Sequence, residues 1–292
     1  MRKINKLKTK TAIILSVFIL LSILAAVTSC KRKGSVEIEK IESQTVVSAD
    51  KPVTTDGDTK TIKGIECVLV KAGTFTMGSP KTENGRNDDE EQYEVTITRD
   101  YWIIKYPITN AQSKSSGNPN HPVTGVTWFD ADTWARSKGA NLPTEAQWEF
   151  AARGGNKSKG YVYGGSDNLD ECGWYKDNLE LDTNQKYQYK PNPSGQKQPN
   201  ELGIYDMSGN IWEWCGDWYE TYPDGPVQDP VGPITNNRSL LGKEGSLPDG
   251  GRVVRGGSWG DYAFSCRIAS RSYAPPSYGE VNIGFRVVFH AD

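Results

Sequence analysis

The chain is 292 residues long, 36% hydrophobic and 24% charged, with a formal net charge of −2 at neutral pH. This weakly acidic balance argues against nucleic acid as a partner, because nucleic-acid-binding domains carry an excess of Lys and Arg. Two histidines are too few for a metal site with three histidine ligands. Nine Trp and thirty Gly favour a fold of loops held by aromatic side chains over a fold of long helices.

The first thirty residues resemble the export signal of a bacterial lipoprotein. Five Lys and Arg residues within the first ten precede an apolar run over residues 12–27, which is shorter than the roughly 20 residues of a membrane span. Val27-Thr28-Ser29-Cys30 follows and resembles a lipobox, in which the cysteine becomes the lipidated N-terminus. We predict a signal peptide over residues 1–29, lipidation at Cys30, and an exported, membrane-anchored lipoprotein on the outer surface of a bacterial cell. An uncleaved N-terminal anchor is the alternative.

Residues 30–60 are predicted to form a flexible tether. They mix Lys, Glu, Asp, Ser, Thr and Val, contain one proline and lack aromatic residues. Such a segment buries too little apolar surface to offset the entropy lost on ordering. Residues 61–292 are then long enough for one large folded domain.

Short strands are predicted at the start of this domain. A β-branched run over residues 65–70 and an alternating run over residues 74–78 are separated by a turn, and residues 93–106 form a further strand region. The charged residues 81–92 are expected to form an exposed loop, and the Ser/Asn/Gly/Pro-rich residues 110–122 a further loop.

Two helices are predicted next. The first is N-capped by Thr127 and ends at Gly139, with small and aromatic residues on one face. The second begins with a capping box formed by Thr144 and Gln147 and ends at Gly154-Gly155. The rest of the chain has Gly, Pro, Asn or Asp every few residues and is expected to be dominated by loops.

Four cysteines follow Cys30, at positions 67, 172, 215 and 266, and none forms a Cys-x-x-Cys pair. Zinc binding and dithiol redox chemistry are therefore weakly indicated. In an exported protein, Cys215 with Cys266 is the first pair to test for a disulfide. Buried free thiols are the alternative.

Five sequence blocks then occur in a defined order: VKAGTFTMG at 70–78, LPTEAQWE at 142–149, GIYDMSGNIWEW at 203–214, RGGSW at 255–259 and NIGFR at 282–286. Together they resemble the formylglycine-generating enzyme (sulfatase-modifying factor) family, over residues 65–289. The resemblance implies an α+β, C-type-lectin-like fold with small antiparallel sheets, two helices and much irregular loop. Gly256 and Gly257 are expected in a tight turn, and Trp259 and Phe285 in the core. Trp212, Trp214 and Trp218 are also expected to be core residues.

The resemblance does not extend to the oxidase chemistry. Family oxidases bind copper through two cysteines five positions apart, shortly after the Gly-Gly-Ser-aromatic turn. Counted from Trp259, the first cysteine is replaced by Asp261, and only Cys266 can stand at the second position. One thiolate cannot form a two-sulfur copper site. We therefore expect no enzyme activity, and a formylglycine-generating-type oxidase or another enzyme of the family is the alternative.

The branch of the family that this chain most resembles is that of retroelement-diversified variable lipoproteins, which display a hypervariable C-terminal segment. Residues 260–282, here called the display segment, are rich in Tyr, Ser, Gly and Asn, the residues of antibody-like recognition loops. In such systems, replacing adenines in Asn codons cannot yield Lys, Gln, Glu, Met or Trp, and of these the segment contains only Glu280. A structural envelope protein without diversification is a further alternative.

We predict that the display segment binds a protein or glycoprotein ligand on another cell surface, carried by a monomeric head. Arg267, Ala269 and Arg271 are expected to anchor the segment on one face while their neighbours are displayed. The predicted ligand-binding residues are Gly260, Asp261, Tyr262, Ser265, Ile268, Ser270, Ser272, Tyr273, Ser277, Tyr278, Gly279, Val281 and Asn282.

The resemblance also implies a calcium site in the block at 203–214. The matching positions are Asp206, Gly209, Ile211 and Glu213, of which the middle two would bind through backbone carbonyls. Alternatively, the two acids cap turns or pair with arginines such as Arg255. No cofactor is expected to be required, apart from this structural calcium.

Overall fold

The computed structural model describes residues 58–179, 190–233 and 250–291, all within one compact unit of residues 54–292. The predicted signal peptide, Cys30 and residues 30–57 of the predicted tether lie outside the described residues. Within these three ranges, no helix is both long and apolar enough to cross a bilayer.

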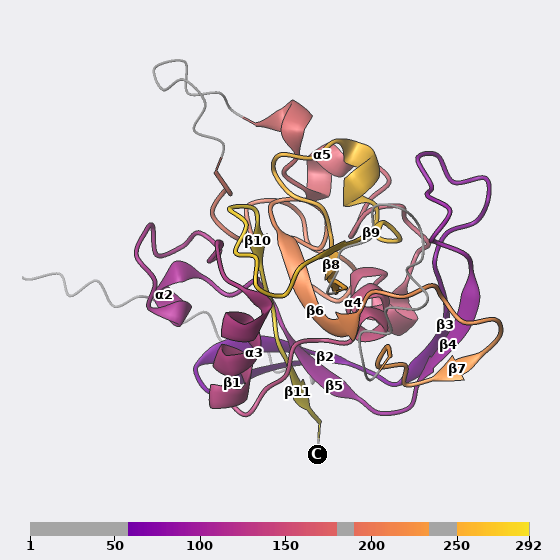
Figure 1. Ribbon diagram of the computed structural model, residues 1–292, viewed down its shortest axis with the longest axis horizontal. Helices are drawn as coiled ribbons and strands as arrows, with labels where there is room; N and C mark the ends of the chain where they lie inside the picture. The colour runs from indigo at the N-terminus through magenta and orange to yellow at the C-terminus, as the bar shows by residue number, and fades with distance from the viewer. Residues whose placement is uncertain (1–57, 180–189, 234–249, 292) are drawn as a thin grey trace, which may run out of the picture. The chain divides into compact units, whose positions relative to one another are not determined.

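The first sheet joins the beginning and the end of the domain. It contains β1 (Thr59–Ile62), β2 (Ile65–Val70), β5 (Tyr101–Ile104) and β11 (Val288–His290), in the spatial order β1-β2-β5-β11. All of its pairings are antiparallel, and β5 lies between β2 and the C-terminal β11 (Figure 1). Because β1 begins at Thr59, the prediction of a flexible tether up to residue 60 is wrong by two residues.

Two further sheets carry the rest of the strands. One has the order β10-β6-β8-β9, formed by β10 (Ile283–Gly284), β6 (Trp212–Trp218), β8 (Arg252–Arg255) and β9 (Arg271–Ala274). The other has the order β3-β4-β7, formed by β3 (Gly73–Met77), β4 (Tyr93–Ile97) and β7 (Val227–Gln228). The β3-β4-β7 sheet lies at the right of Figure 1, and α3 (Trp128–Ser137) lies at the left.

The predicted strands are present, and their pairing, which was not predicted, places them in different sheets. The strands at 65–70 and 73–77 both exist, yet β2 pairs with β1 and β5 while β3 pairs with β4. The predicted strand region 93–106 is divided into β4 and β5, which belong to different sheets. The turn between β2 and β3 therefore transfers the chain from one sheet to another and closes no hairpin.

Both predicted helices are present with their predicted caps. The Thr127 hydroxyl accepts a hydrogen bond from the Asp130 N–H at 3.1 Å at the start of α3. Thr144 and Gln147 form the reciprocal capping box of α4 (Glu145–Ala152), with distances of 3.0 and 3.1 Å. Gly139, at φ 71°, follows the end of α3.

The other helical elements are short. They are α2 (Asn110–Ser113), α5 (Leu169–Cys172) and the 3₁₀ turns Gly155–Lys157, Lys176–Asn178 and Ala263–Cys266. The prediction that residues 110–122 form only loop is wrong at α2, because Thr109 and Gln112 form a third capping box there. Such a box supplies partners to backbone N–H groups that a loop would leave to water.

The core consists of two main apolar clusters. One surrounds α4, which packs against β3, β4, β6 and β8 and buries Trp148 and Phe150 completely. The other includes the buried residues of α3 together with Trp214 and Phe285. Of the three tryptophans of β6 predicted as core residues, Trp214 is fully buried, whereas Trp212 and Trp218 are half-buried.

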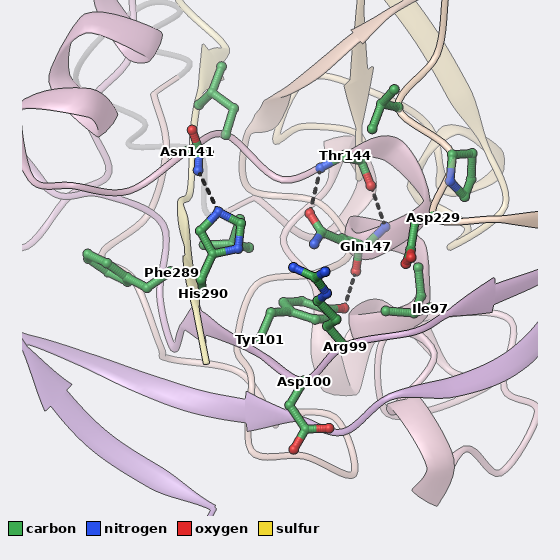
Figure 2. Close-up of a pocket in the computed structure, with 14 residues that line it drawn as sticks. Ile97, Arg99, Asp100, Tyr101, Asn141, Thr144, Gln147, Asp229, Phe289 and His290 are labelled. Carbon is green, nitrogen blue, oxygen red and sulfur yellow. Dashed lines mark hydrogen bonds between the residues drawn. The ribbon is translucent and has the colours of Figure 1, made fainter. Parts of the chain in front are cut away.

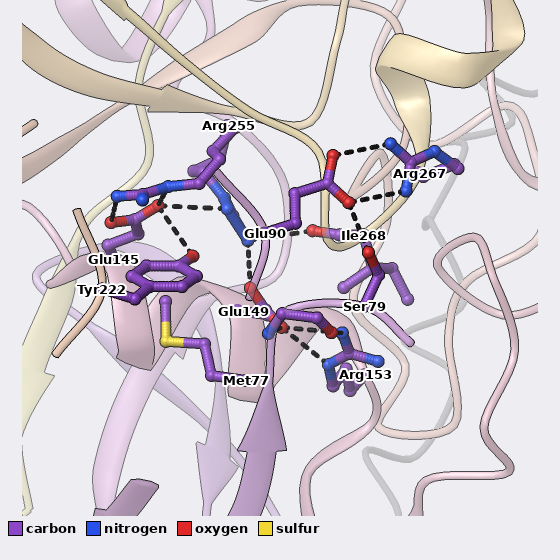
Figure 3. Close-up of polar contacts among 12 residues, drawn as sticks. Met77, Ser79, Glu90, Glu145, Glu149, Arg153, Tyr222, Arg255, Arg267 and Ile268 are labelled. Carbon is purple, nitrogen blue, oxygen red and sulfur yellow. Dashed lines mark hydrogen bonds and ion pairs between the residues drawn. The ribbon is translucent and has the colours of Figure 1, made fainter. Parts of the chain in front are cut away.

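Buried Arg and Glu side chains form ion pairs within the core (Figure 3). The guanidinium of Arg255 donates to Glu145 at 3.1 Å, to Glu149, and to the Ile268 carbonyl at 2.9 Å. Arg271 donates to both oxygens of Glu145, at 2.8 and 2.7 Å. Because removing one partner leaves an uncompensated buried charge, these pairs hold β8, β9 and α4 in one arrangement.

Candidate ligand-binding surface

A tight turn that only glycine fits lies just before the display segment. Gly256 and Gly257 have φ of 98° and 73°, and a Cβ on Gly257 would lie 2.6 Å from the Cys266 sulfur. Asp261 closes the turn, because its Oδ2 accepts from the Ser258 N–H at 3.0 Å and from the Trp212 indole N–H at 2.8 Å. The carboxylate predicted to contact ligand is therefore held inside the scaffold.

The first exposed part of the segment is aromatic. Tyr262 and Phe264 are 49% and 51% exposed, and their rings stack with centroids 5.9 Å apart. Lys176 donates to the Tyr262 hydroxyl at 2.8 Å and lies over the same ring. Phe264 was not among the predicted ligand-binding residues, although its position inside the segment could have indicated it.

The middle of the segment runs through the interior. Ile268 and Ser270 are only 2% and 3% exposed, so the prediction that they are displayed is wrong. The prediction assumed a strand from residue 267, but β9 begins at Arg271, and the Ile268 N–H donates to the Val162 carbonyl at 2.9 Å. Arg267 and Ala269 are buried as predicted, together with Arg271.

Arg267 ties the segment to the loop of residues 79–91 (Figure 3). Its guanidinium donates to both oxygens of Glu90, at 2.8 and 2.7 Å, and to Glu83 at 2.6 Å. Its Nε donates to the Phe264 carbonyl at 2.9 Å. Glu90 is fully buried, so the loop predicted as simply exposed is attached to the display segment at this point.

The last part of the segment is exposed again. Tyr278 and Val281 are 54% and 67% exposed, on a turn supported by the start of α3. The Gly125 N–H donates to the Glu280 carbonyl at 2.9 Å, and a Cβ on Gly279 would lie 2.6 Å from the Gly125 oxygen. Tyr273 is less free, because its ring packs on Tyr219 with centroids 4.6 Å apart.

Most of the predicted ligand-binding residues therefore reach solvent, in two places separated by a buried stretch. Those exposed are Gly260, Tyr262, Tyr273, Ser277, Tyr278, Gly279 and Val281, those half-buried are Asp261, Ser265, Ser272 and Asn282, and those buried are Ile268 and Ser270. The amide of Asn282 donates to the Ser258 hydroxyl at 3.2 Å, which joins the two ends of the segment.

A separate cavity of about 310 Å³ lies away from the display segment (Figure 2). It is lined by parts of β4, β5, α4 and β11, and several of its polar groups take part in structural contacts. Thr144 and Gln147 cap α4 there, and the Tyr101 hydroxyl donates to the Gln147 carbonyl at 2.7 Å. None of the predicted site residues lines this cavity.

Comparison with known proteins places the chain in a family. The family described as "Sulfatase-modifying factor enzyme 1-like domain" matches residues 53–291. The chain belongs to this family. It is 37% identical over 193 residues to the formylglycine-generating enzyme of Streptomyces coelicolor, a match that covers 62% of this chain and 57% of that enzyme. It is 30% identical over 266 residues to the chaperone protein LppX of Paenibacillus barcinonensis, covering 72% of this chain and 82% of that protein.

Solved structures share the fold. Treponema denticola variable protein 1 matches with a TM-score of 0.61 at 22% identity, over 80% of this chain and 98% of that chain. PvdO from Pseudomonas aeruginosa matches with a TM-score of 0.61 at 23% identity, over 78% of this chain and 95% of that chain. The predicted α+β, C-type-lectin-like fold of the sulfatase-modifying factor family is thereby confirmed. The chain spans less than two thirds of the length of the Streptomyces enzyme.

The residues present do not fit the two-thiolate copper site of the family's oxidases. Asp261 stands at the first cysteine position and is engaged by Ser258 and Trp212. Cys266 is fully buried, and burial raises the pKa of its thiol. All four described cysteines are free; Cys266 packs in one cluster with Cys172, whereas Cys215 lies in another, so the structure does not bring the predicted pair together.

Of the two acidic positions that match the family's calcium site, Glu213 is engaged by protein groups at both oxygens and Asp206 at one oxygen only. Both oxygens of Glu213 accept from Arg286, at 2.6 and 2.8 Å, and one also accepts from the Trp148 indole at 2.7 Å. Asp206 accepts from the Gly195 N–H at 2.8 Å, and its other oxygen is buried without a partner. Among the described residues, no group of three or more His, Cys, Asp or Glu side chains is placed to hold a metal ion. Arg286 thus takes the place that the sequence alternative gave to Arg255.

Proposed function

We propose that this protein is a surface-tethered lipoprotein that binds a protein or glycoprotein ligand through residues 260–282. The proposal rests on the distribution of exposed apolar side chains. The described residues have seven exposed large apolar side chains, and five of them, Tyr262, Phe264, Tyr273, Tyr278 and Val281, belong to this one segment. Exposed aromatic and apolar side chains that are concentrated in one segment are typical of an interaction site.

The scaffold under the segment suits such a role. Buried arginines anchor it at Arg267 and Arg271, and the turn at Gly257 anchors its start. Tyr and Phe side chains have only two rotatable bonds, so they lose little entropy on binding. Substitutions at exposed positions such as Tyr278 would change the ligand contacts without disturbing these anchors. A diversified binding protein needs this separation, and the Treponema relative in fold is itself named a variable protein.

The deciding experiment exchanges the segment. A chimera carrying residues 260–282 from a variant protein should fold with an unchanged circular dichroism spectrum and capture different proteins from neighbouring-cell surfaces. Capture of the same partners with the same strength by both proteins would contradict the proposal. Diversification has its own test, since it requires a neighbouring near-repeat of the C-terminal coding sequence with Asn codons at the exposed positions.

The rival proposal is an oxidase of the formylglycine-generating type, favoured by the 37% identity to the Streptomyces enzyme. Asp261 at the first cysteine position and the burial of Cys266 support absence of this activity. Incubation with copper and a sulfatase-motif peptide should leave the mass of the peptide unchanged. Conversion of the peptide cysteine to an aldehyde would overturn the non-enzymatic proposal.

The membrane tether is part of the proposal and depends on Cys30. We expect the Cys30→Ala variant to leave the detergent phase in phase partitioning, because one lipid-bearing cysteine would be lost. Partitioning that stays unchanged would favour an uncleaved anchor.

A further inference from the structure

A second recognition element lies beside the exposed aromatic residues of the display segment. A cavity of about 450 Å³ is bounded on one side by the loop Asn84–Asn87 and on the other by Tyr163, Ala263 and Phe264. This volume is within the range of small-molecule sites, roughly 300–1,000 Å³. One wall belongs to the display segment, and the opposite wall belongs to a loop some 180 residues earlier in the chain, so no local sequence pattern could have indicated the cavity.

The lining combines one exposed aromatic ring with neutral hydrogen-bonding groups. No hydrogen bond within the described part of the chain engages the side-chain amides of Asn84 and Asn87 or the hydroxyl of Tyr163. An amide offers both donors and acceptors, and a phenol offers one of each. These groups are therefore available to a ligand.

The charge of the cavity is balanced by the protein itself. Arg86 is the only charged residue in the lining, and it pairs with Glu91 and donates to the Ser79 carbonyl at 3.3 Å. An anionic ligand would have to compete with Glu91 for this guanidinium. A purely apolar ligand would remove water from Asn84, Asn87 and Tyr163 without replacing their hydrogen bonds, which is costly.

The two walls are held at a defined separation. Arg267 donates to the Gly85 carbonyl at 2.6 Å and to the Phe264 carbonyl at 2.9 Å, so a single buried guanidinium bridges the loop and the segment. A Cβ on Gly85 would lie 2.8 Å from the Phe264 Cβ, which shows how closely the walls approach at the base. A cavity preorganised in this way loses little entropy on binding.

We propose that this cavity binds a neutral sugar residue of a glycan, with Phe264 as the stacking surface and with Asn84, Asn87 and Tyr163 as hydrogen-bonding groups. A pyranose ring has an apolar face for the aromatic ring and hydroxyls that both donate and accept, which matches the lining. The inference builds on the proposed ligand-binding function, and it identifies the ligand's chemistry as the carbohydrate of a glycoprotein. A peptide that binds by its side chains is the competing outcome.

The first test uses full-length protein in detergent with immobilised neutral oligosaccharides that end in mannose, galactose, glucose or N-acetylglucosamine. We expect binding to at least one of them, weakened about tenfold in Phe264→Ala. Tenfold corresponds to about 1.4 kcal/mol, which is within the range of aromatic contacts. Asn84→Ala/Asn87→Ala should weaken it similarly. Phe129→Ala is the matched control, because Phe129 is 54% exposed, like Phe264, but lies on α3 outside the cavity. Equal binding by Phe264→Ala and Phe129→Ala would overturn the proposal.

The second test separates this inference from the proposed function. Neighbouring-cell surface proteins are captured before and after mild periodate oxidation, which cleaves the vicinal diols of sugars and leaves most of the polypeptide intact. Loss of capture after oxidation, together with loss in Phe264→Ala, supports the sugar site. Capture that survives oxidation but changes in the segment chimera overturns the sugar site and leaves the proposed function standing. Capture that responds to neither treatment overturns both.

Discussion

At the scale of single residues, the display segment contains two kinds of side chain with opposite roles. Arg267 and Arg271 are 1% and 5% exposed and are satisfied by Glu90 and Glu145, so they belong to the scaffold. Tyr262 and Tyr278 are about half exposed, at 49% and 54%. Change is therefore tolerated at the second kind of position and not at the first.

An alanine series should separate these roles. We expect Tyr262→Ala and Tyr278→Ala to change the free energy of unfolding by less than about 0.5 kcal/mol, because exposed positions rarely contribute more. Trp259→Ala and Phe285→Ala should cost about 3–5 kcal/mol, since each leaves a cavity. Tyr273→Ala should lie between, because its ring packs on Tyr219. Thermal unfolding of each variant measures the order, and equal losses at Tyr262 and Trp259 would contradict it.

At the scale of elements, local chemistry was predictable and long-range pairing was not. The capping boxes at Thr127 and Thr144 involve residues three positions apart, so the sequence alone located α3 and α4. The pairing of β5 with β2 and β11 depends on contacts between distant parts of the chain, and the alternation of apolar residues does not specify the partner. The same limit explains why Ile268 and Ser270 were wrongly predicted to be exposed. The prediction assumed a strand, but the segment between the 3₁₀ turn and β9 is not a strand.

The attachment of the 79–91 loop to the display segment can be tested at Arg267. Arg267→Ala leaves Glu90 fully buried without its cation, and breaking a buried ion pair costs about 3–5 kcal/mol. We expect lower stability in urea and faster proteolysis within residues 79–91. Arg136→Ala is the control, because Arg136 pairs with Asp132 at the surface and its loss should leave stability nearly unchanged. If both variants unfold at the same urea concentration as the parent, Arg267 is not the link.

At the scale of the whole domain, most of the buried carboxylates and guanidinium groups of the described residues are paired with one another. Both oxygens of Glu213 already accept from Arg286, so a calcium ion at the positions implied by the family would have to compete with a guanidinium. Asp206 and Gly209 lie in the loop before β6, whereas Glu213 lies within β6. The partner of Glu213 could not be predicted, because Arg286 lies far along the chain.

Because Arg286 already pairs with Glu213, we expect calcium to leave the thermal stability of the domain unchanged. The melting temperature of the domain should be the same in EDTA and in millimolar calcium, since an ion that does not bind the folded state cannot raise its stability. A saturable rise in melting temperature with calcium would contradict the expectation. In that case Glu213→Gln, which removes the charge of the implied ligand, should abolish the rise.

Asp217 makes stability depend on pH. The pKa of this carboxyl is raised to about 7, first by burial and then by the nearby Glu145 carboxylate. In the unfolded chain an aspartate titrates near about 3.9, so between these two values the folded state binds the proton more tightly. Asp217 therefore destabilises the fold progressively as pH rises from about 4 to about 7. Its Oδ2 accepts the Glu145 N–H at 2.8 Å, a contact that an asparagine oxygen can keep.

We therefore expect Asp217→Asn to flatten the decline in stability across this pH range and to be more stable than the parent at pH 8. Part of the decline should remain, because burial also raises the pKa of Asp206, to about 6. Urea unfolding between pH 5 and pH 8 measures the slope. Asp100→Asn is the control, since the Ala72 N–H lowers the pKa of Asp100 and places its titration below this range. If the slope in Asp217→Asn equals that of the parent, the buried carboxylate is already neutralised by Arg271 and Arg252, the two cations that oppose its shift.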